Sequence, residues 1–184
     1  MKNHYDVSRT LIYSIIAILL MLPALVKAIT IFEGALVDSP CQIDPSSNSI
    51  NVDFLDIPVK NFHFGDGRGY IEKFDIKLIN CKPSDINKEV KLYFDGREDG
   101  SLSGYLAVDG VNDKKLAIGI LDTDGISLLK LKSAHNNGNG TPIKNGVMTL
   151  SFSAFVQATP EALANKTVVP SNYSAVATFS LIYS

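Results

Sequence analysis

Short extended segments, separated by turn-forming residues, fill the chain after Cys41. Hydrophobic residues alternate along these segments, and no stretch of helical length carries an apolar stripe at the 3.6-residue spacing. The intervening "DGREDGS", "DTDG" and "HNNGNG" supply residues that tolerate positive φ or bond to their own backbone. About eight such segments in roughly 150 residues predict an all-β fold, and their spacing favours a β-sandwich.

The expected strands are located by their alternation, because every second residue of a strand lies on the same face. They lie at residues 49–59, 70–81, 89–94, 104–110, 115–122, 126–131, 147–158 and 173–184. In the first two, the shared faces consist of Ile50, Val52 and Phe54, and of Phe74, Ile76 and Leu78. One helical turn is expected where Thr159 precedes Pro160, with Glu161 in the first turn.

The N-terminus has the three parts of a secretory signal. Lys2 and Arg9 lie in a polar start, residues 11–26 form an uncharged apolar run, and a small-residue site ends at Ala28. A membrane anchor is the alternative, but a run of about 16 residues is shorter than the roughly 20 needed to span a bilayer. Lys27 also interrupts the run. We therefore expect cleavage after Ala28 and export.

The charge of the remaining chain excludes one class of partner. Removal of residues 1–28 takes away three basic residues and one acidic one, so the balance of 17 minus 19 becomes 14 minus 18, or about −4. A mildly acidic chain has no electrostatic footprint for nucleic acid, so no nucleic-acid partner is expected. The remaining length suffices for a single domain with its own core.

Cys41 and Cys81 are the only cysteines, and both follow the expected cleavage point. In an exported protein they can form a disulfide, which would close a loop of about 40 residues and contribute about 4 kcal/mol. A metal site is the alternative for two isolated cysteines. It requires two further ligands at suitable spacing, and no pair of histidines offers them.

Three features resemble parts of catalytic or metal-binding motifs. "GDGRG" at residues 65–69 has glycines but lacks the Lys-Ser/Thr pair of a phosphate-binding loop, so a plain loop is predicted. "DTDG" at residues 122–125 lacks the rest of a calcium loop, so a hairpin turn is predicted. His63 and His135 stand alone, without a nucleophile elbow or a zinc motif. We therefore expect no catalytic residues, no metal, no cofactor and no enzymatic activity.

The N-terminal end of the exported chain reads as a strand without an obvious partner. One of its two rows consists of Thr30, Phe32, Gly34 and Leu36. Glu33 marks the opposite row as the outward one. Gly34 weakens a strand unless another backbone or a bulky neighbour must come close, which points to a binding role for this face.

The C-terminal end also reads as a strand, and the chain stops at Ser184 without a turn. One face consists of Ala177, Phe179, Leu181 and Tyr183. An apolar strand left open at a sheet edge is an aggregation hazard, so a partner is expected. The alternative is that the two end strands pair with each other or with interior strands, and the pattern alone does not separate these cases.

Several segments together resemble the pilins of chaperone–usher fimbriae, the family that builds type 1 and P pili. "FEGALVDSPC" resembles the Gly-containing extension of that family running into the first cysteine, and "FDIKLINC" resembles the strand that carries the second. The terminal "SAVATFSLIYS", with penultimate Tyr183, is typical of the family. "LAIGILDTDGISLL" and "ATPEALANKTVVP" are similar to its tip-fibrillum adaptor subunits. The resemblance covers essentially the whole exported chain.

The resemblance implies an immunoglobulin-like β-sandwich that lacks its C-terminal strand and has an apolar groove beside its last strand. A strand donated by a chaperone, and later by the next subunit, would complete the fold. The implied organisation is a secretory signal at 1–28, a donor-strand extension at 29–39 and a pilin domain at 40–184. Cys41 and Cys81 would form the structural disulfide.

The same resemblance implies roles for residues at both ends. The donor-strand face would be the row that contains Phe32 and Gly34, inserted into the groove of a neighbouring subunit. A chaperone strand would pair along Phe179, Leu181 and Tyr183, and basic residues of the chaperone would hold the carboxylate of Ser184. Thr30 stands where the family has a larger apolar residue, so its contact is expected to be weak.

The expected function is that of a minor fimbrial subunit, an adaptor that joins the pilus rod to the tip fibrillum at the cell-surface fimbrium. The expected partners are a periplasmic chaperone, an outer-membrane usher and the neighbouring tip-fibrillum and rod subunits. A rod subunit and a pilus terminator are the alternatives within the family. A self-contained secreted ligand-binding sandwich and an exported enzyme are the alternatives outside it.

Overall fold

The computed structural model describes residues 40–82 and 88–184, which belong to one compact unit. The expected signal at 1–28 and the expected extension at 29–39 lie outside the described residues. The expected donor face, Thr30, Phe32, Gly34 and Leu36, lies outside them too.

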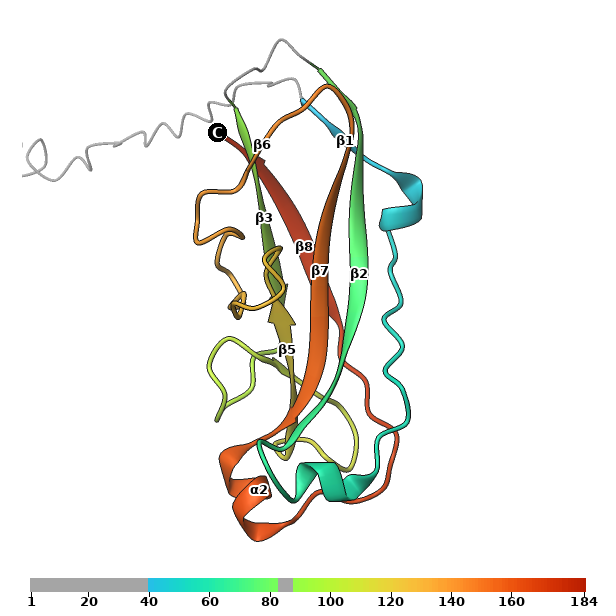
Figure 1. The fold of residues 1–184 in the computed structure, drawn as a ribbon, viewed down its shortest axis with the longest axis vertical. Coiled ribbons are helices and arrows are strands. Elements are labelled where there is room, and N and C mark those ends of the chain that lie inside the picture. Colours follow the sequence, from blue (N-terminus) through green and yellow to red (C-terminus); the bar gives the residue numbers. More distant parts are fainter. Residues whose placement is uncertain (1–39, 83–87) are drawn as a thin grey trace, which may run out of the picture. The chain divides into compact units, whose positions relative to one another are not determined.

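Two antiparallel β-sheets form a sandwich, which confirms the predicted all-β class (Figure 1). The first sheet contains, in spatial order, β1 (Gln42–Ile43), β2 (Arg68–Cys81), β7 (Gly146–Ala158), β5 (Leu116–Leu121) and β4 (Leu106–Ala107). The second sheet contains β6 (Thr141–Pro142), β3 (Glu89–Gly96) and β8 (Ala177–Tyr183). The strands β1 and β8 therefore lie at sheet edges.

In the described residues, three short helices lie between the strands: η1 (Pro45–Ser47), η2 (Val59–Phe62) and α2 (Pro160–Asn165). The predicted helical turn is confirmed as α2. Thr159 is its N-cap, with Oγ1 accepting the Ala162 N–H at 3.3 Å, and Pro160 occupies the first turn. Among the described residues, no helix has the length and apolar content that a membrane span requires.

The core lies between the sheets and is built from the inward rows of the long strands. On β2, Ile76 and Leu78 are fully buried and Phe74 packs against them at the margin, as the alternation predicted. The other large buried side chains include Val90, Leu92 and Phe94 on β3, Leu116 and Ile118 on β5, and Leu150, Phe152 and Val156 on β7. The aromatic ring of Phe152 lies at the centre, within 6.0 Å of three other ring centroids.

The strand expected at residues 126–131 does not form, and the prediction was wrong there. The carboxylate of Asp124 accepts the backbone N–H groups of Ile126 and Ser127, at 2.9 and 2.8 Å. Backbone groups bonded to a nearby side chain are lost to a strand ladder. Only one isolated bridge, between Leu121 and Leu128, joins this segment to β5.

The segment expected as a strand at residues 49–59 forms no ladder either. Its apolar row was predicted correctly, because Ile50, Val52 and Phe54 are half-buried and pack against the core. The segment lacks a neighbouring strand on which to pair. The reason is the groove beside it, described next.

Candidate functional site

A groove of about 1190 Å³ lies along one side of the sandwich. Residues 48–57 form one wall and residues 168–179 form the other. The floor consists mainly of apolar core residues from both sheets: Phe74, Ile76, Phe94, Leu106, Leu116, Ile118, Ile120 and Ala154. The floor residues other than Phe74 are themselves buried, and they lie between two segments of extended chain.

The backbone of β8 has an open edge toward this groove. Glu89 and Ser184 exchange both backbone hydrogen bonds, at 2.9 and 3.1 Å, and so form a hydrogen-bonded pair of the antiparallel ladder. Such pairs alternate with non-bonded pairs, and the register therefore makes Leu92–Leu181 a non-bonded pair. The N–H and C=O groups of alternate β8 residues then point away from β3. These residues are Ala177, Phe179, Leu181 and Tyr183.

The side chains of β8 alternate as the sequence predicted. Phe179, Leu181 and Tyr183 are half-buried and pack against the core, whereas Ala177, at the start of the strand, is exposed. The ring of Phe179 meets Phe94 edge to face, with centroids 6.5 Å apart. The same residues thus combine unpaired backbone groups on one edge with apolar side chains packed on the core, and Phe179 also lines the groove. Ser184 follows them and is exposed.

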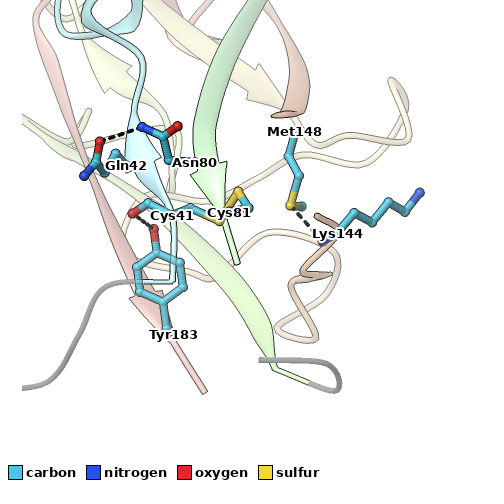
Figure 2. Close-up of a disulfide and its surroundings, with 7 residues drawn as sticks. All are labelled: Cys41, Gln42, Asn80, Cys81, Lys144, Met148 and Tyr183. Carbon is cyan, nitrogen blue, oxygen red and sulfur yellow. Dashed lines mark hydrogen bonds between the residues drawn. A yellow bond between two sulfur atoms is a disulfide. The ribbon is translucent and has the colours of Figure 1, made fainter. Parts of the chain in front are cut away.

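The disulfide and a hydrogen bond from Tyr183 tie together β1, β2 and β8 (Figure 2). Cys41 and Cys81 form a disulfide, which joins the beginning of β1 to the end of β2. The Tyr183 hydroxyl donates to the Cys41 carbonyl oxygen at 3.1 Å, so the last strand is tied to the same point. The Asn80 side chain adds a 3.0 Å hydrogen bond to Gln42.

The two histidines singled out in the sequence have structural surroundings. His135 is fully buried: Nδ1 accepts the Leu92 N–H at 3.0 Å, and Nε2 lies 2.8 Å from the Thr141 hydroxyl. It links the 135–141 loop to β3. His63 lies elsewhere in the fold, with Nε2 2.9 Å from the Val168 carbonyl oxygen. The alternation pattern gave no indication that His135 is a core residue.

Burial lowers the pKa of His135 below its ordinary value, although the nearby Asp122 carboxylate opposes this. The unfolded chain then binds a proton more readily than the folded one. Below a pH of about 6.5, stability should fall by up to about 1.4 kcal/mol per pH unit, until the lower folded pKa is reached. His135→Asn retains an acceptor for Leu92 and does not titrate. We expect a weaker pH dependence below 6.5 in denaturant unfolding of this variant, and an unchanged slope would contradict the assignment.

The glycine-rich segment is a loop up to Gly67, as predicted, with its last two residues in β2, and the acidic segment is a turn. Gly65 and Gly67 both have positive φ, and the loop leads directly into β2. In "DTDG", the Gly125 N–H donates to the Asp122 carbonyl oxygen at 2.8 Å. Hydrogen bonds from the Ser127 side chain and from nearby backbone N–H groups lower the pKa of Asp124, whose oxygens are thereby occupied. The described residues contain no cluster of three or more potential metal ligands.

These features define a class of protein: a β-sandwich with an open edge strand beside an apolar groove. A sequence profile described as "Fimbrial protein" matches residues 30–184, so the chain belongs to the fimbrial protein family. The chain is 44% identical over 152 residues to the fimbrial adapter PapK of Escherichia coli, which covers 83% of this chain and 85% of PapK. It is 32% identical over 154 residues to the major MR/P fimbria protein of Proteus mirabilis, covering 83% and 81% of the two chains.

Solved structures agree with the fold. The P pilus rod subunit PapA superposes with a TM-score of 0.65 at 25% identity, covering 79% of this chain and all of PapA. A subunit of a chaperone–usher pilus, from a structure that addresses rod uncoiling, gives a TM-score of 0.65 at 25% identity, covering 88% of this chain and 98% of that subunit. The protein therefore has the immunoglobulin-like pilin fold that the resemblance implied.

Proposed function

We propose that this protein is a fimbrial adaptor subunit that joins a pilus rod to a tip fibrillum. The open edge of β8 beside the apolar groove is the observation that carries the proposal. A strand added there would bond to the backbone groups of Phe179, Leu181 and Tyr183, and its alternate side chains would cover the floor. Assembly by strand donation requires no catalytic residue.

The adaptor role rests on the degree of relatedness. Identity to PapK is 44%, against 32% to the major MR/P fimbria protein and 25% to the rod subunit PapA. A rod subunit is the competing candidate. The superposition on PapA supports a rod role, but the lower identity to PapA makes this support weaker than the support for an adaptor. Self-polymerisation of the purified chain would identify a rod subunit.

The proposed partners follow from the open edge. A periplasmic chaperone would fill the groove during export, with its basic residues on the Ser184 carboxylate, and an outer-membrane usher would exchange it for a neighbouring subunit. The protein would then reside in the cell-surface fimbrium. Its own residues 29–39, exposed after cleavage at Ala28, would be the strand given to another subunit.

Production of residues 29–184 in a periplasm, with and without a P-pilus chaperone, tests the proposal. We expect soluble folded protein only with the chaperone, as a one-to-one complex, because the unpaired edge of β8 otherwise promotes aggregation. Folded yield and the mass of the complex are the measurements. A cooperatively unfolding monomer obtained without chaperone would overturn the proposal and favour a self-contained sandwich.

The proposed donor face has its own test. Phe32→Asp or Gly34→Lys places a charge in a strand that must lie in an apolar groove, so insertion into a neighbouring subunit should be abolished. Chaperone binding should be unchanged, because the chaperone occupies this subunit's own groove. Glu33→Gln, on the opposite row, is the matched control and should insert normally. Unimpaired insertion by both charged variants would refute the assignment.

A further inference from the structure

The wall of the groove that precedes β8 has little regular structure of its own. Residues 168–176 connect α2 to β8 and contain a single bridge residue, Ser174, paired with Asp109. The Asp109 N–H donates to the Ser174 carbonyl oxygen at 2.7 Å. A wall held by one bridge depends on side-chain contacts for its position.

Asn112 makes most of those contacts, and His63 adds one, with Nε2 2.9 Å from the Val168 carbonyl oxygen. The Nδ2 of Asn112 donates to the Val169 carbonyl oxygen at 2.8 Å and to the Ser171 hydroxyl at 2.9 Å, and its Oδ1 accepts the Val169 N–H at 3.0 Å. The residue is only 1% exposed and lies in the lining of the groove. Both side-chain donors are used, so the amide holds the wall by three hydrogen bonds.

The backbone of Asn112 is fixed to the floor. Its carbonyl oxygen accepts the N–H groups of Lys115 and Leu116, at 2.9 and 3.0 Å. Leu116 begins β5 and is itself a buried floor residue. Asn112 thus connects the floor to the wall directly.

The same wall meets the opposite wall through aromatic rings. Tyr173 packs against Phe54, with ring centroids 6.1 Å apart, and both rings are half-buried in the groove lining. Displacement of residues 169–171 would therefore also move the contact between Tyr173 and Phe54, which sets the distance between the two walls at the α2 end of the groove. Arg97 braces the loop that carries Asn112 through ion pairs to Asp109 and Asp113.

We infer that Asn112 is a positioning residue for the strand that enters the groove: it sets the position of the wall at the end near α2. This inference rests on the proposed function and assigns to one side chain the shape of one end of the groove. A purely structural role would lower stability equally whatever strand is bound. If Asn112 has a positioning role, its loss should reduce the stability gained from only those residues of the inserted strand that reach the α2 end of the groove.

Two lengths of complementing strand separate these cases. A strand of alternating threonine and valine is added through an Asn-Gly turn made by Ser184→Asn followed by glycine. The turn then follows Tyr183, whose backbone groups point away from β3, and the added strand runs antiparallel to β8. Since antiparallel residues pair one for one, a seven-residue strand ends opposite Ala177 and an eleven-residue strand reaches Tyr173. The equilibrium constant for unfolding is measured in denaturant for each strand length. The ratio of the two constants gives the stability gained from the last four residues of the longer strand.

In the wild type, the longer strand should be more stabilising. In Asn112→Ala the ratio of the two unfolding equilibrium constants should be about tenfold smaller than in the wild type. A tenfold change corresponds to the loss of buried hydrogen bonds of the kind that Asn112 makes. Ser171→Ala keeps the buried amide of Asn112 and removes one acceptor on an exposed residue, so this variant should fold even if Asn112→Ala does not. In Ser171→Ala the gain from the longer strand should be about threefold smaller than in the wild type. Asp122→Ala, a buried hydrogen-bonded residue outside the groove lining, should keep the wild-type gain within about twofold.

Undiminished gains in Asn112→Ala and Ser171→Ala would overturn the inference while leaving the proposed function intact. An equal reduction in Asp122→Ala would also overturn it, because the effect would then be general. If neither strand stabilises the wild type, the groove does not accept a strand. That result would contradict the proposed function, and it would contradict the inference as well because the inference rests on that function.

Discussion

Replacing Cys41 and Cys81 together by alanine is expected to lower the free energy of unfolding by about 4 kcal/mol. The two cysteines are 40 residues apart in sequence, so their disulfide removes a large loop entropy from the unfolded chain. It also holds the start of β1, which pairs with β2 through only two residues. The wall at residues 48–57 follows directly and should lose its anchor.

The measurement is denaturant unfolding of the chain completed by the eleven-residue strand, with and without the disulfide. Tyr183→Phe is the matched control, because it removes only the hydrogen bond to the Cys41 carbonyl oxygen and should cost about 1 kcal/mol. A double alanine variant as stable as Tyr183→Phe would show that noncovalent contacts anchor this end of the groove.

Phe152→Ala should cost about 3–5 kcal/mol, the range for removing a buried phenylalanine. Phe152 is 1% exposed and meets Phe94 edge to face at 5.3 Å between centroids, with Phe74 at 5.9 Å and His135 at 6.0 Å. Phe74 and Phe94 form part of the groove floor. Loss of the central ring should therefore also weaken strand binding.

Thr149→Ala provides the comparison for this variant. Thr149 lies on the outward row of the same strand, so its replacement should change stability by no more than about 0.5 kcal/mol. Unfolding midpoints and strand-insertion rates should be measured for both variants. If Phe152→Ala inserts a strand at the wild-type rate despite lower stability, the floor does not depend on the ring beneath it.

Local patterns predicted the parts of this fold that depend on local physics. Alternation placed Ile76, Leu78, Phe179 and Leu181 correctly, because strand geometry sends alternate residues to one face whatever the partner. Thr159 before Pro160 predicted α2 for a similarly local reason. The strand expected at 126–131 failed because alternation does not report the competing hydrogen bonds of Asp124.

The sequence by itself determined the β class, the inward rows and, through family membership, a fimbrial subunit. The family resemblance implied a groove beside the last strand, but only the tertiary structure identified the residues that line it, because its floor comes from strands distant in sequence. It also showed that His135 is buried and that Asn112 joins wall to floor. These properties arise from contacts 43 and 57 residues apart in sequence, and no local pattern encodes such contacts.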